Sequence, residues 1–387
     1  MRHEEAMTYR SIFVASTGQN VGKTTTCLGL VSGLSKRYER VGFMKPVGQE
    51  HVETDTGLHV DKDVVLFKDY FHLNSGEEEM SPVLFPRGFT RDYLDGKVDH
   101  AQLQEKIRTA FYNLCDRNDI TVVEGTGHCG VGSMVDLNNA QVAAMLNMPV
   151  VLVASGGLGS SFDELTLNHN LCQIEGAKVA GIILNRVLPE KREMIESYMK
   201  KALKKWGIPL LGSIPYDAFL SNPSMKDFEA LFNTTLLSGE EFQMRHFRHT
   251  RLVTTSVETY ENLIVNNQLI ITAASREDII LATLTKYWDA KIANPKDDIE
   301  AGMILTGSAP PRQAIVEQLK KAHIPMLYAP MASYAAMKMI TTFTVKIRKE
   351  DTLKIQEAVD LVEKHIDFDT LISILQNGAK SLPETVP

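Results

Sequence analysis

Residues 11–30 read SIFVASTGQNVGKTTTCLGL. The β-branched and apolar residues predict a strand over Ile12–Ala15, and the small residues and leucines predict a helix over Thr24–Lys36. Between them, glycines let backbone N–H groups converge on phosphate oxygens, and the helix N-terminus adds unsatisfied donors. The strict pattern GxxxxGK[ST] fails at one position, since Thr17 stands where its first glycine belongs. A strand, a phosphate-binding loop and a helix are therefore predicted in succession.

The loop predicts which residues hold a polyphosphate. Lys23 is expected to bind the β- and γ-phosphates and to stabilise charge if phosphoryl transfer takes place, and the Thr24 hydroxyl is expected to ligate Mg²⁺. The predicted nucleotide-binding residues of this segment are Thr17, Gly18, Asn20, Val21, Gly22, Lys23, Thr24 and Thr25.

Charged residues also follow other predicted strands. Glu124 ends the apolar run Ile120–Val123, and ligands of open α/β sheets bind at the carboxyl ends of strands. A metal role is therefore expected for Glu124. Lys45 ends another predicted strand, where it would neutralise the γ-phosphate or a substrate anion. Asp61 and Asp63 open a helical pattern, which favours N-capping, with contact to the metal by one of them as the alternative.

Short β-branched runs alternate with helical patterns from residue 11 to about 215. This alternation predicts an α/β fold with a parallel sheet and helices on both faces. We predict a P-loop nucleotide-binding domain over residues 1–220, a linker over 221–250 and a smaller α/β domain over 251–387. The predicted strands are Ile12–Ala15, Val41–Lys45, Thr121–Glu124, Val150–Ala154, Gly181–Asn185 and Leu210–Ile214, and, in the second domain, Leu269–Thr272, Gly302–Leu305, Met326–Tyr328 and Thr344–Ile347.

The last long helical pattern covers Asp351–Ile366. Its apolar stripe predicts docking on the second domain. A membrane-surface helix is the less favoured alternative, because acidic and basic residues mix on the polar face.

Composition excludes several classes of function. The 387 residues include 41 Lys and Arg and 48 Asp and Glu, which gives a net charge of −7 and disfavours nucleic acid and anionic lipid as partners. The longest apolar runs have strand length, so no membrane span is expected. The 4 cysteines are scattered, which favours reduced thiols and a cytoplasmic protein.

Several motifs carry a family resemblance: TGQNVGKTT, MKPVG, DKDVVLF, SPVLFPRGFTRD, VVEGTG, GIILNRV and PLLGSIPYD, in this order. Together they resemble the dethiobiotin synthetase branch of the phosphate-loop proteins, and more closely the N-terminal part of long bacterial phosphotransacetylases. Residues 269–281, 303–308 and 343–347 resemble the DRTGG domain of those enzymes. Ser275 and Ser308 replace its aspartate and second glycine. No acetyltransferase domain is recognised, so acetyl transfer by this chain alone is not implied.

The resemblance also implies roles for single residues. Asn185 matches the asparagine that reads adenine in dethiobiotin synthetase, and Pro215 would flank the base. Lys45 matches a lysine near phosphate and substrate. The positions that match phosphate and Mg²⁺ contacts are Lys23, Thr24, Asp63 and Glu124.

Two functions remain open at this point. The first is an ATP- and Mg²⁺-binding sensor or regulatory protein, with or without weak ATP hydrolysis, whose second domain could bind a small metabolite. The alternative is an ATP-dependent ligase of the dethiobiotin synthetase type, which activates a small carboxylate or carbamate with Lys23 and Lys45 as catalytic residues. By analogy with the related proteins, a homo-oligomer is expected.

Overall fold

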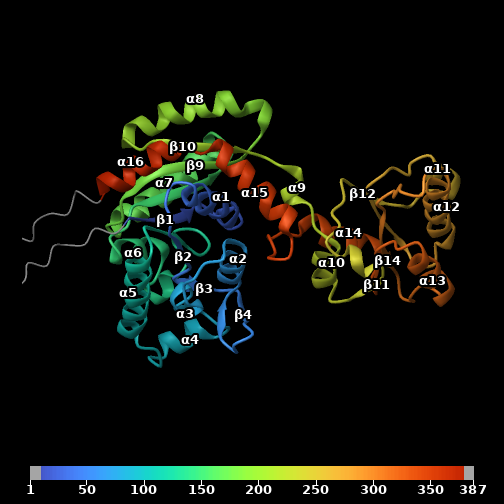
Figure 1. Cartoon of the computed structure of the whole chain (residues 1–387), viewed down its shortest axis with the longest axis horizontal. Helices are drawn as coiled ribbons and strands as arrows, with labels where there is room; N and C mark the ends of the chain where they lie inside the picture. Colours follow the sequence, from blue (N-terminus) through green and yellow to red (C-terminus); the bar gives the residue numbers. More distant parts are fainter. Residues whose placement is uncertain (1–9, 379–387) are drawn as a thin grey trace, which may run out of the picture. The chain divides into compact units, whose positions relative to one another are not determined.

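The computed structural model describes residues 10–378 and divides the chain into two compact units (Figure 1). The first unit contains the chain up to Asp217 and again from Ile347 onward, and the second unit is Ala218–Lys346. The second unit is thus an insertion into the first. This division differs from the three consecutive segments predicted from the sequence.

A six-stranded sheet forms the centre of the first unit, with the strand order β10-β9-β8-β1-β7-β2. All neighbouring strands are parallel. The chain builds one half of the sheet with β2 and β7 and then crosses to the other side of β1. The carboxyl end of β1 is therefore the position where ligands bind in such sheets. The strands are β1 (Ser11–Ser16), β2 (Val41–Met44), β7 (Ile120–Glu124), β8 (Val150–Ser155), β9 (Val179–Val187) and β10 (Leu210–Pro215).

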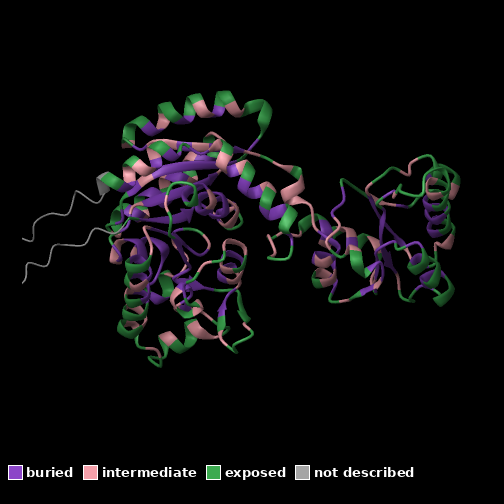
Figure 2. Cartoon of the chain, in the orientation of Figure 1, coloured by how far each residue is buried: buried purple, intermediate pink, exposed green. Residues whose placement is uncertain are grey.

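Helices flank this sheet, and Figure 2 shows buried strands beneath helices with exposed outer sides. The predicted parallel α/β fold is thus confirmed. The main helices are α1 (Lys23–Ser35), α5 (His100–Arg117), α6 (Asn139–Met145), α7 (Gly159–Ile174) and α8 (Arg192–Leu203). Shorter elements fill the connection between β2 and β7: β3 (Val47–Gly48), β4 (His51–Glu53), β5 (His59–Asp61), α2 (Lys62–Phe71), α3 (Glu77–Met80), β6 (Val83–Leu84) and α4 (Phe89–Leu94).

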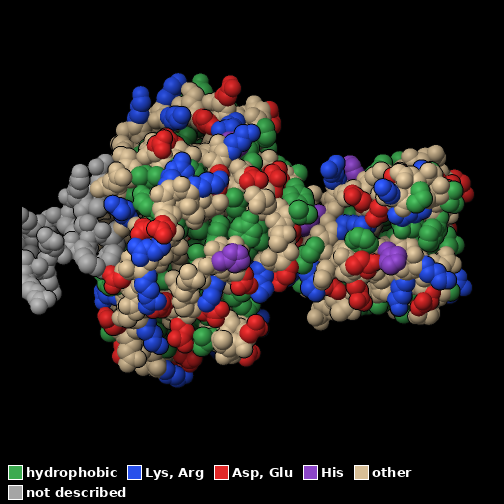
Figure 3. Space-filling model, viewed as in Figure 1, with side chains coloured by type: hydrophobic (Ala, Val, Ile, Leu, Met, Phe, Trp, Pro, Cys, Tyr) green, Lys and Arg blue, Asp and Glu red, His purple; other side chains and the backbone are tan. Residues whose placement is uncertain are grey.

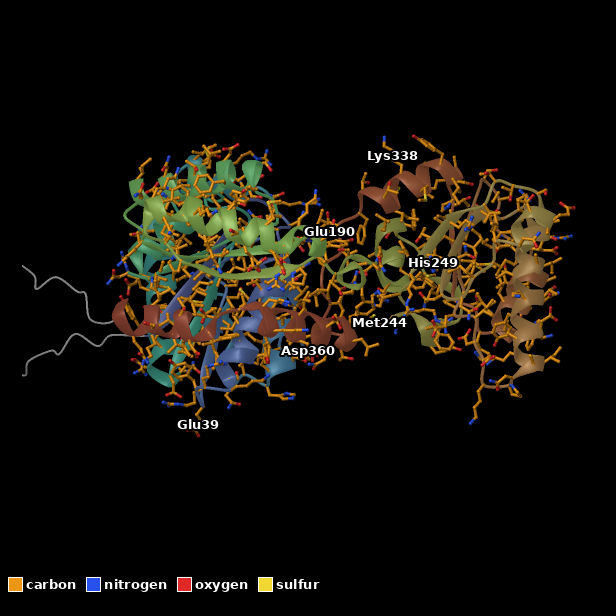
Figure 4. All side chains as sticks on the ribbon, turned by 90° about the horizontal axis from the view of Figure 1, so that it is seen from above. Glu39, Glu190, Met244, His249, Lys338 and Asp360 are labelled. Carbon is orange, nitrogen blue, oxygen red and sulfur yellow. The ribbon has the colours of Figure 1, made fainter. Side chains whose placement is uncertain are left out.

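Two C-terminal helices, α15 (Thr352–His365) and α16 (Phe368–Gly378), complete the first unit. Figure 4, in which Asp360 is labelled on α15, shows this helix beside the blue ribbon of the first helices. A Cβ added to Gly29 of α1 would lie 2.3 Å from the Cβ of Val362 on α15. Docking of this segment on the second domain was therefore a wrong prediction. Its apolar stripe is real, but it packs on α1, and a stripe alone does not specify its partner.

The second unit has its own sheet, with the strand order β11-β15-β14-β13-β12, in which only β11 is antiparallel. Two apolar clusters lie on the faces of this sheet. The strands are β11 (Leu236–Ser238), β12 (His249–Leu252), β13 (Gln268–Ala273), β14 (Gly302–Thr306) and β15 (Met326–Ala329), and the helices are α9 (Ala218–Ser221), α10 (Met225–Phe232), α11 (Val257–Glu261), α12 (Glu277–Ala293), α13 (Gln313–Lys321) and α14 (Ser333–Thr342).

Two further predictions are corrected here. The expected linker, residues 221–250, is folded into the second unit, where it supplies α10, β11 and the start of β12. Arg245 from this segment is nearly buried and pairs with Asp298 of the same unit at 2.6 Å, so it makes a structural contact. The expected strand Thr344–Ile347 is absent, since residues 343–348 have no regular secondary structure.

Charge is distributed in keeping with the composition. On the face shown in Figure 3, basic and acidic side chains are interspersed. Among the described residues, no helix has both the length and the apolar character needed to cross a bilayer.

Candidate phosphate and metal site

The loop between β1 and α1 is held in a strained turn by its neighbours. Asn20 has a φ of 56° and Gly22 a φ of 97°, both in the left-handed region. A Cβ on Gly22 would lie 2.1 Å from Nδ2 of Asn185, so only glycine fits there. The same Nδ2 donates a hydrogen bond to the carbonyl of Val21 at 2.8 Å. Asn185, at the carboxyl end of β9, therefore supports the loop from a strand far away in sequence.

Lys23 is buried at the start of α1. Its Nζ donates to the carbonyl of Gly127 at 2.5 Å and to Oγ of Ser16 at 3.0 Å. Burial lowers the pKa of Lys23, while Glu124 acts in the opposite direction. The ammonium group thus lies where the ends of β1 and β7 meet, directly beside the loop.

Thr24 and Glu124 form the second part of the site. The Thr24 hydroxyl donates to Oε1 of Glu124 at 2.9 Å. Oε2 of Glu124 is buried without a hydrogen-bond partner, and burial raises the pKa of this carboxyl group. An unpartnered buried carboxylate oxygen is costly. Next to a hydroxyl group, it supplies the kind of oxygen ligands that Mg²⁺ takes.

Lys45 lies among three carboxylates at the same sheet edge. Its Nζ hydrogen-bonds Asp63, lies 3.2 Å from Oε1 of Glu124 and lies 3.8 Å from Oδ1 of Asp61. Burial alone would lower the pKa of Lys45, but Asp63, Glu124 and Asp61 together raise it well above its ordinary value. Lys45 in turn holds the pKa of Asp63 below its ordinary value against the effect of burial.

Asp61 and Asp63, for which the sequence left N-capping and metal contact open, make different contacts in the structure. Asp61 is the N-cap of α2, because its Oδ1 accepts from the backbone N–H of Asp63 at 3.0 Å. Burial raises the pKa of Asp61 to about 6. Asp63 reaches the ammonium group of Lys45 and, through it, the neighbourhood of Glu124.

No group of three or more His, Cys, Asp and Glu side chains is arranged to hold a metal ion by itself, within residues 10–378. A Mg²⁺ site does not require such a group, because Mg²⁺ usually binds one or two carboxylates and completes its octahedral coordination with phosphate oxygens and water. Thr24 and Glu124 fit such a partial set. Asp63 fits it less directly, because Lys45 already neutralises its charge.

The structure brings together Lys23, Thr24, Lys45, Asp63 and Glu124. The remaining predicted residues lie at the loop itself or at neighbouring strand ends. The Thr17 hydroxyl donates to Glu164 of α7 at 3.1 Å, and Pro215 ends β10 in register with Val187 of β9. Gly18, Asn20, Val21 and Gly22 form the turn, and Thr25 lies in the first turn of α1.

Sequence reasoning missed two acceptors for Lys23. The carbonyl of Gly127 and the hydroxyl of Ser16 both contact its ammonium group. The glycines after Glu124 were the available signal, because they let the backbone approach the loop closely.

Comparison with known families agrees with this geometry. The AAA domain family matches residues 10–224, and the DRTGG domain family matches residues 230–343. The phosphate acetyltransferase of Synechocystis sp. is 25% identical over 374 residues, which are 95% of this chain and 52% of that protein. The phosphate acetyltransferase of Pseudomonas putida is 27% identical over 375 residues, 92% of this chain and 51% of that protein. The chain thus spans about half the length of the curated relatives it matches.

Solved structures are more distant. The MinC:MinD cell division protein complex of Aquifex aeolicus has a TM-score of 0.36 and 14% identity, over 55% of this chain and 83% of that one. The CBS and DRTGG domains of the Clostridium perfringens pyrophosphatase regulatory region have a TM-score of 0.27 and 14% identity, over 51% of this chain and 76% of that one. Both likenesses are too weak to indicate a function.

The predicted resemblance to the N-terminal part of the phosphotransacetylases is confirmed by the two domain matches and by these relatives. The chain belongs to the AAA domain family, with a DRTGG domain following the phosphate-loop domain.

Proposed function

We propose that the chain binds ATP with Mg²⁺ at the loop after β1 and serves as a nucleotide-dependent regulatory protein. The observation that carries the proposal is the unpartnered Oε2 of Glu124, buried beside the Thr24 hydroxyl and close to Lys23. A bound cation would satisfy this oxygen. The metal, once bound, would neutralise charge on the β- and γ-phosphates.

The chain's own groups account for phosphate binding. Lys23 would exchange the carbonyl of Gly127 for a phosphate oxygen, which a cation binds more strongly than a neutral carbonyl. The N–H groups of the loop and of the first turn of α1 would supply further donors. Thr24 and Glu124 would hold the metal, and Lys45 would keep the neighbouring carboxylates from repelling the γ-phosphate.

Selection of adenine is assigned to Asn185 and Pro215. Both lie near the carboxyl ends of adjacent strands, β9 and β10, which are separated from β1 by β8 in the sheet. The amide of Asn185 donates to Val21, and its Oδ1 accepts from the N–H of Arg186 at 2.9 Å. Reading of the base would therefore be coupled to the conformation of the phosphate loop.

A regulatory role is favoured by the order of the domains. The second unit interrupts the first and returns to it through α15, which packs on the helix that begins at Lys23. A shift of α1 on nucleotide binding would thus move α15, the helix that follows the inserted unit in the chain. Differential contacts with the γ-phosphate are the usual source of such a change.

Thermal unfolding with ATP and Mg²⁺ tests the loop assignment. A ligand present at 100 times its Kd stabilises a protein by about 2.7 kcal/mol, and we expect the Lys23→Ala variant to lose this stabilisation. Lys36→Ala is the matched control, because Lys36 directly follows α1, is exposed and pairs with Glu363. Equal stabilisation of Lys23→Ala and the unmodified protein would refute the assignment.

Two further measurements separate the remaining choices. Calorimetric titration with ATP and GTP tests the adenine assignment, and Asn185→Ala should reduce the preference for ATP. ADP release measured with and without small carboxylic acids and amines tests the ligase alternative. Stimulation by such a substrate would replace the regulatory proposal with a ligase.

A further inference from the structure

Four exposed lysines lie close together at the end of α8. Lys200 and Lys201 are in the last turn of this helix, and Lys204 and Lys205 are in the 3-10 turn that follows it. This turn leads to the amino end of β10, whereas the phosphate loop follows the carboxyl end of β1. Since the strands of the sheet are parallel, the lysines lie toward its opposite edge. The proposed nucleotide site therefore does not account for them.

The charge of this lysine cluster is not compensated. Among residues 10–378, no carboxylate lies within 4.0 Å of its ammonium groups. Residues 198–206 contain four lysines and no Asp or Glu, in a chain whose net charge is −7. Figure 3 shows basic side chains over the left end of α8. The dipole of a helix favours cations in its last turn, but half of the cluster lies beyond the helix, so the dipole explains only a part of it.

Apolar side chains are exposed on the same helix. Met194 is 45% exposed and Tyr198 is 52% exposed, and they lie one turn apart on α8. Lys201 lies over the ring of Tyr198, with its Nζ 4.9 Å from the ring centroid. The side of α8 that packs on the sheet is apolar as well and consists of Ile195, Met199 and Leu203. The exposed side thus combines apolar side chains with a cluster of cations, which is the composition of a surface that binds anionic membranes.

Nucleic acid fits this surface less well than lipid. Proteins that bind single strands stack the bases on free faces of aromatic rings. Here Lys201 lies over the ring of Tyr198. Trp206, at the end of the cluster, already stacks on Phe162 and His169. The cluster also contains no arginine, whose planar guanidinium group binds phosphate in a fixed geometry. Lysine is a point charge on a flexible stem, which suits a surface of mobile headgroups.

We propose that this end of α8 binds an anionic lipid surface. The four ammonium groups would lie at the level of the headgroups, and Met194 and Tyr198 would contact the boundary with the acyl chains. The net charge of −7 makes such a partner unfavourable on average. However, surface charges are screened over a Debye length of about 10 Å in 0.1 M salt, so the lysines next to the lipid outweigh distant carboxylates. Binding to lipid does not depend on the proposed nucleotide site.

Co-sedimentation of the full chain with vesicles tests this surface. The chain should bind vesicles rich in phosphatidylserine, should not bind vesicles of phosphatidylcholine alone, and should be released by salt. Lys200→Gln and Lys204→Gln should each lower the affinity roughly fivefold. Replacement of all four lysines by glutamine should abolish measurable binding. The proposal is overturned if the unmodified chain does not bind the anionic vesicles, or if it binds both kinds of vesicle equally.

A matched variant carries the same change of net charge in other parts of the chain. It replaces four exposed lysines outside residues 198–206 by glutamine, namely Lys97, Lys320, Lys321 and Lys338. This variant should bind anionic vesicles as the unmodified chain does. Equal loss of binding in both four-lysine variants would show that net charge alone is responsible, and would overturn the proposed surface.

A last comparison distinguishes lipid from other polyanions. Tyr198→Gln should weaken binding to anionic vesicles severalfold and leave binding to soluble polyglutamate or single-stranded DNA unchanged, because only a membrane offers an apolar layer to the ring. Tighter binding to either polymer than to the vesicles would assign the cluster to a protein or a nucleic acid, and would overturn the lipid assignment.

Discussion

The contact between Gly33 of α1 and Phe368 at the start of α16 yields a prediction in which the sign of a mutation reverses. A Cβ added to Gly33 would lie 2.1 Å from Cζ of Phe368, and this ring is 5% exposed. Gly33→Ala should therefore destabilise the first unit. The same substitution should become stabilising once the ring is removed by Phe368→Ala.

The magnitudes follow from two opposing effects. Overpacking of a tight contact costs about 1–3 kcal/mol, whereas replacing glycine by alanine in a helix interior contributes about 0.8–1 kcal/mol of stability. Gly33→Ala alone should thus lower the free energy of unfolding by roughly 0–2 kcal/mol. Phe368→Ala should cost about 3–5 kcal/mol. In that background, Gly33→Ala should raise stability by roughly 0.5–1 kcal/mol, so the coupling energy is about 1–3 kcal/mol.

Urea denaturation can be read for the first unit alone. The chain has 2 tryptophans, Trp206 in the first unit and Trp288 in the second. Trp288 is 43% exposed, so Trp288→Phe leaves Trp206 as the single tryptophan, which can be excited selectively, at little cost. Trp206 stacks on Phe162 and His169, with ring centroids 4.8 Å and 4.4 Å apart, and its emission should change when this unit unfolds.

A second glycine of α1 provides the matched control. At Gly29, the clash of an added Cβ includes the Cβ of Val362 itself, 2.3 Å away. Val362→Ala keeps that atom and should not rescue Gly29→Ala. Additive effects of Gly33→Ala and Phe368→Ala, with no change of sign, would show that α16 does not press on α1 as described.

Three further outcomes are expected. In thermal melts, Thr24→Val should remove most of the stabilisation by ATP that depends on Mg²⁺, whereas Thr24→Ser should keep it. Equal Mg²⁺ dependence of these two variants would contradict the metal assignment. Burial lowers the pKa of His169. The stability that the neutral imidazole contributes is therefore present above pH 6.5, the ordinary value, and is lost as the pH falls through the lowered value. The Trp206 emission should change with pH in that range, and His169→Gln should remove this change. Asp298→Ala leaves the nearly buried Arg245 unpaired and should lower the stability of the second unit by about 1–3 kcal/mol, read from its own tryptophan while the emission of Trp206 stays constant.

Much of the first unit could be predicted because its signals are local. A central parallel strand is buried on both faces and is typically a short β-branched run, as Val150–Ser155 is. The loop residues Lys23 and Thr24 follow from a motif whose spacing is set by the size of a phosphate group. The prediction for Glu124 follows from its place at a strand end. In the structure its Oε1 accepts a hydrogen bond from the Thr24 hydroxyl, and its metal role stays a prediction.

The errors concern contacts between segments that are distant in the sequence. The apolar stripe of α15 would suit either unit. Gly29 of α1 makes room for Val362 of α15, and Gly33 makes room for Phe368 of α16. The segment 221–250 is rich in polar and basic residues, yet Phe247 packs in the core of the second unit, where a Cβ on Gly302 would lie 2.2 Å from its ring. Close packing of a side chain against a backbone requires a glycine in one segment, whereas the residue that packs on it has no distinctive sequence signal.

The insertion of the second unit also determines the order in which the protein can fold during synthesis. The segment 218–346 leaves the ribosome whole, while the first unit still lacks α15 and α16. At about 5–20 residues per second, these roughly 130 residues take about 6–26 seconds to make. During that interval the face of α1 that holds Gly29 and Gly33 is uncovered, so a nascent chain exposes apolar surface beside an unfinished phosphate loop.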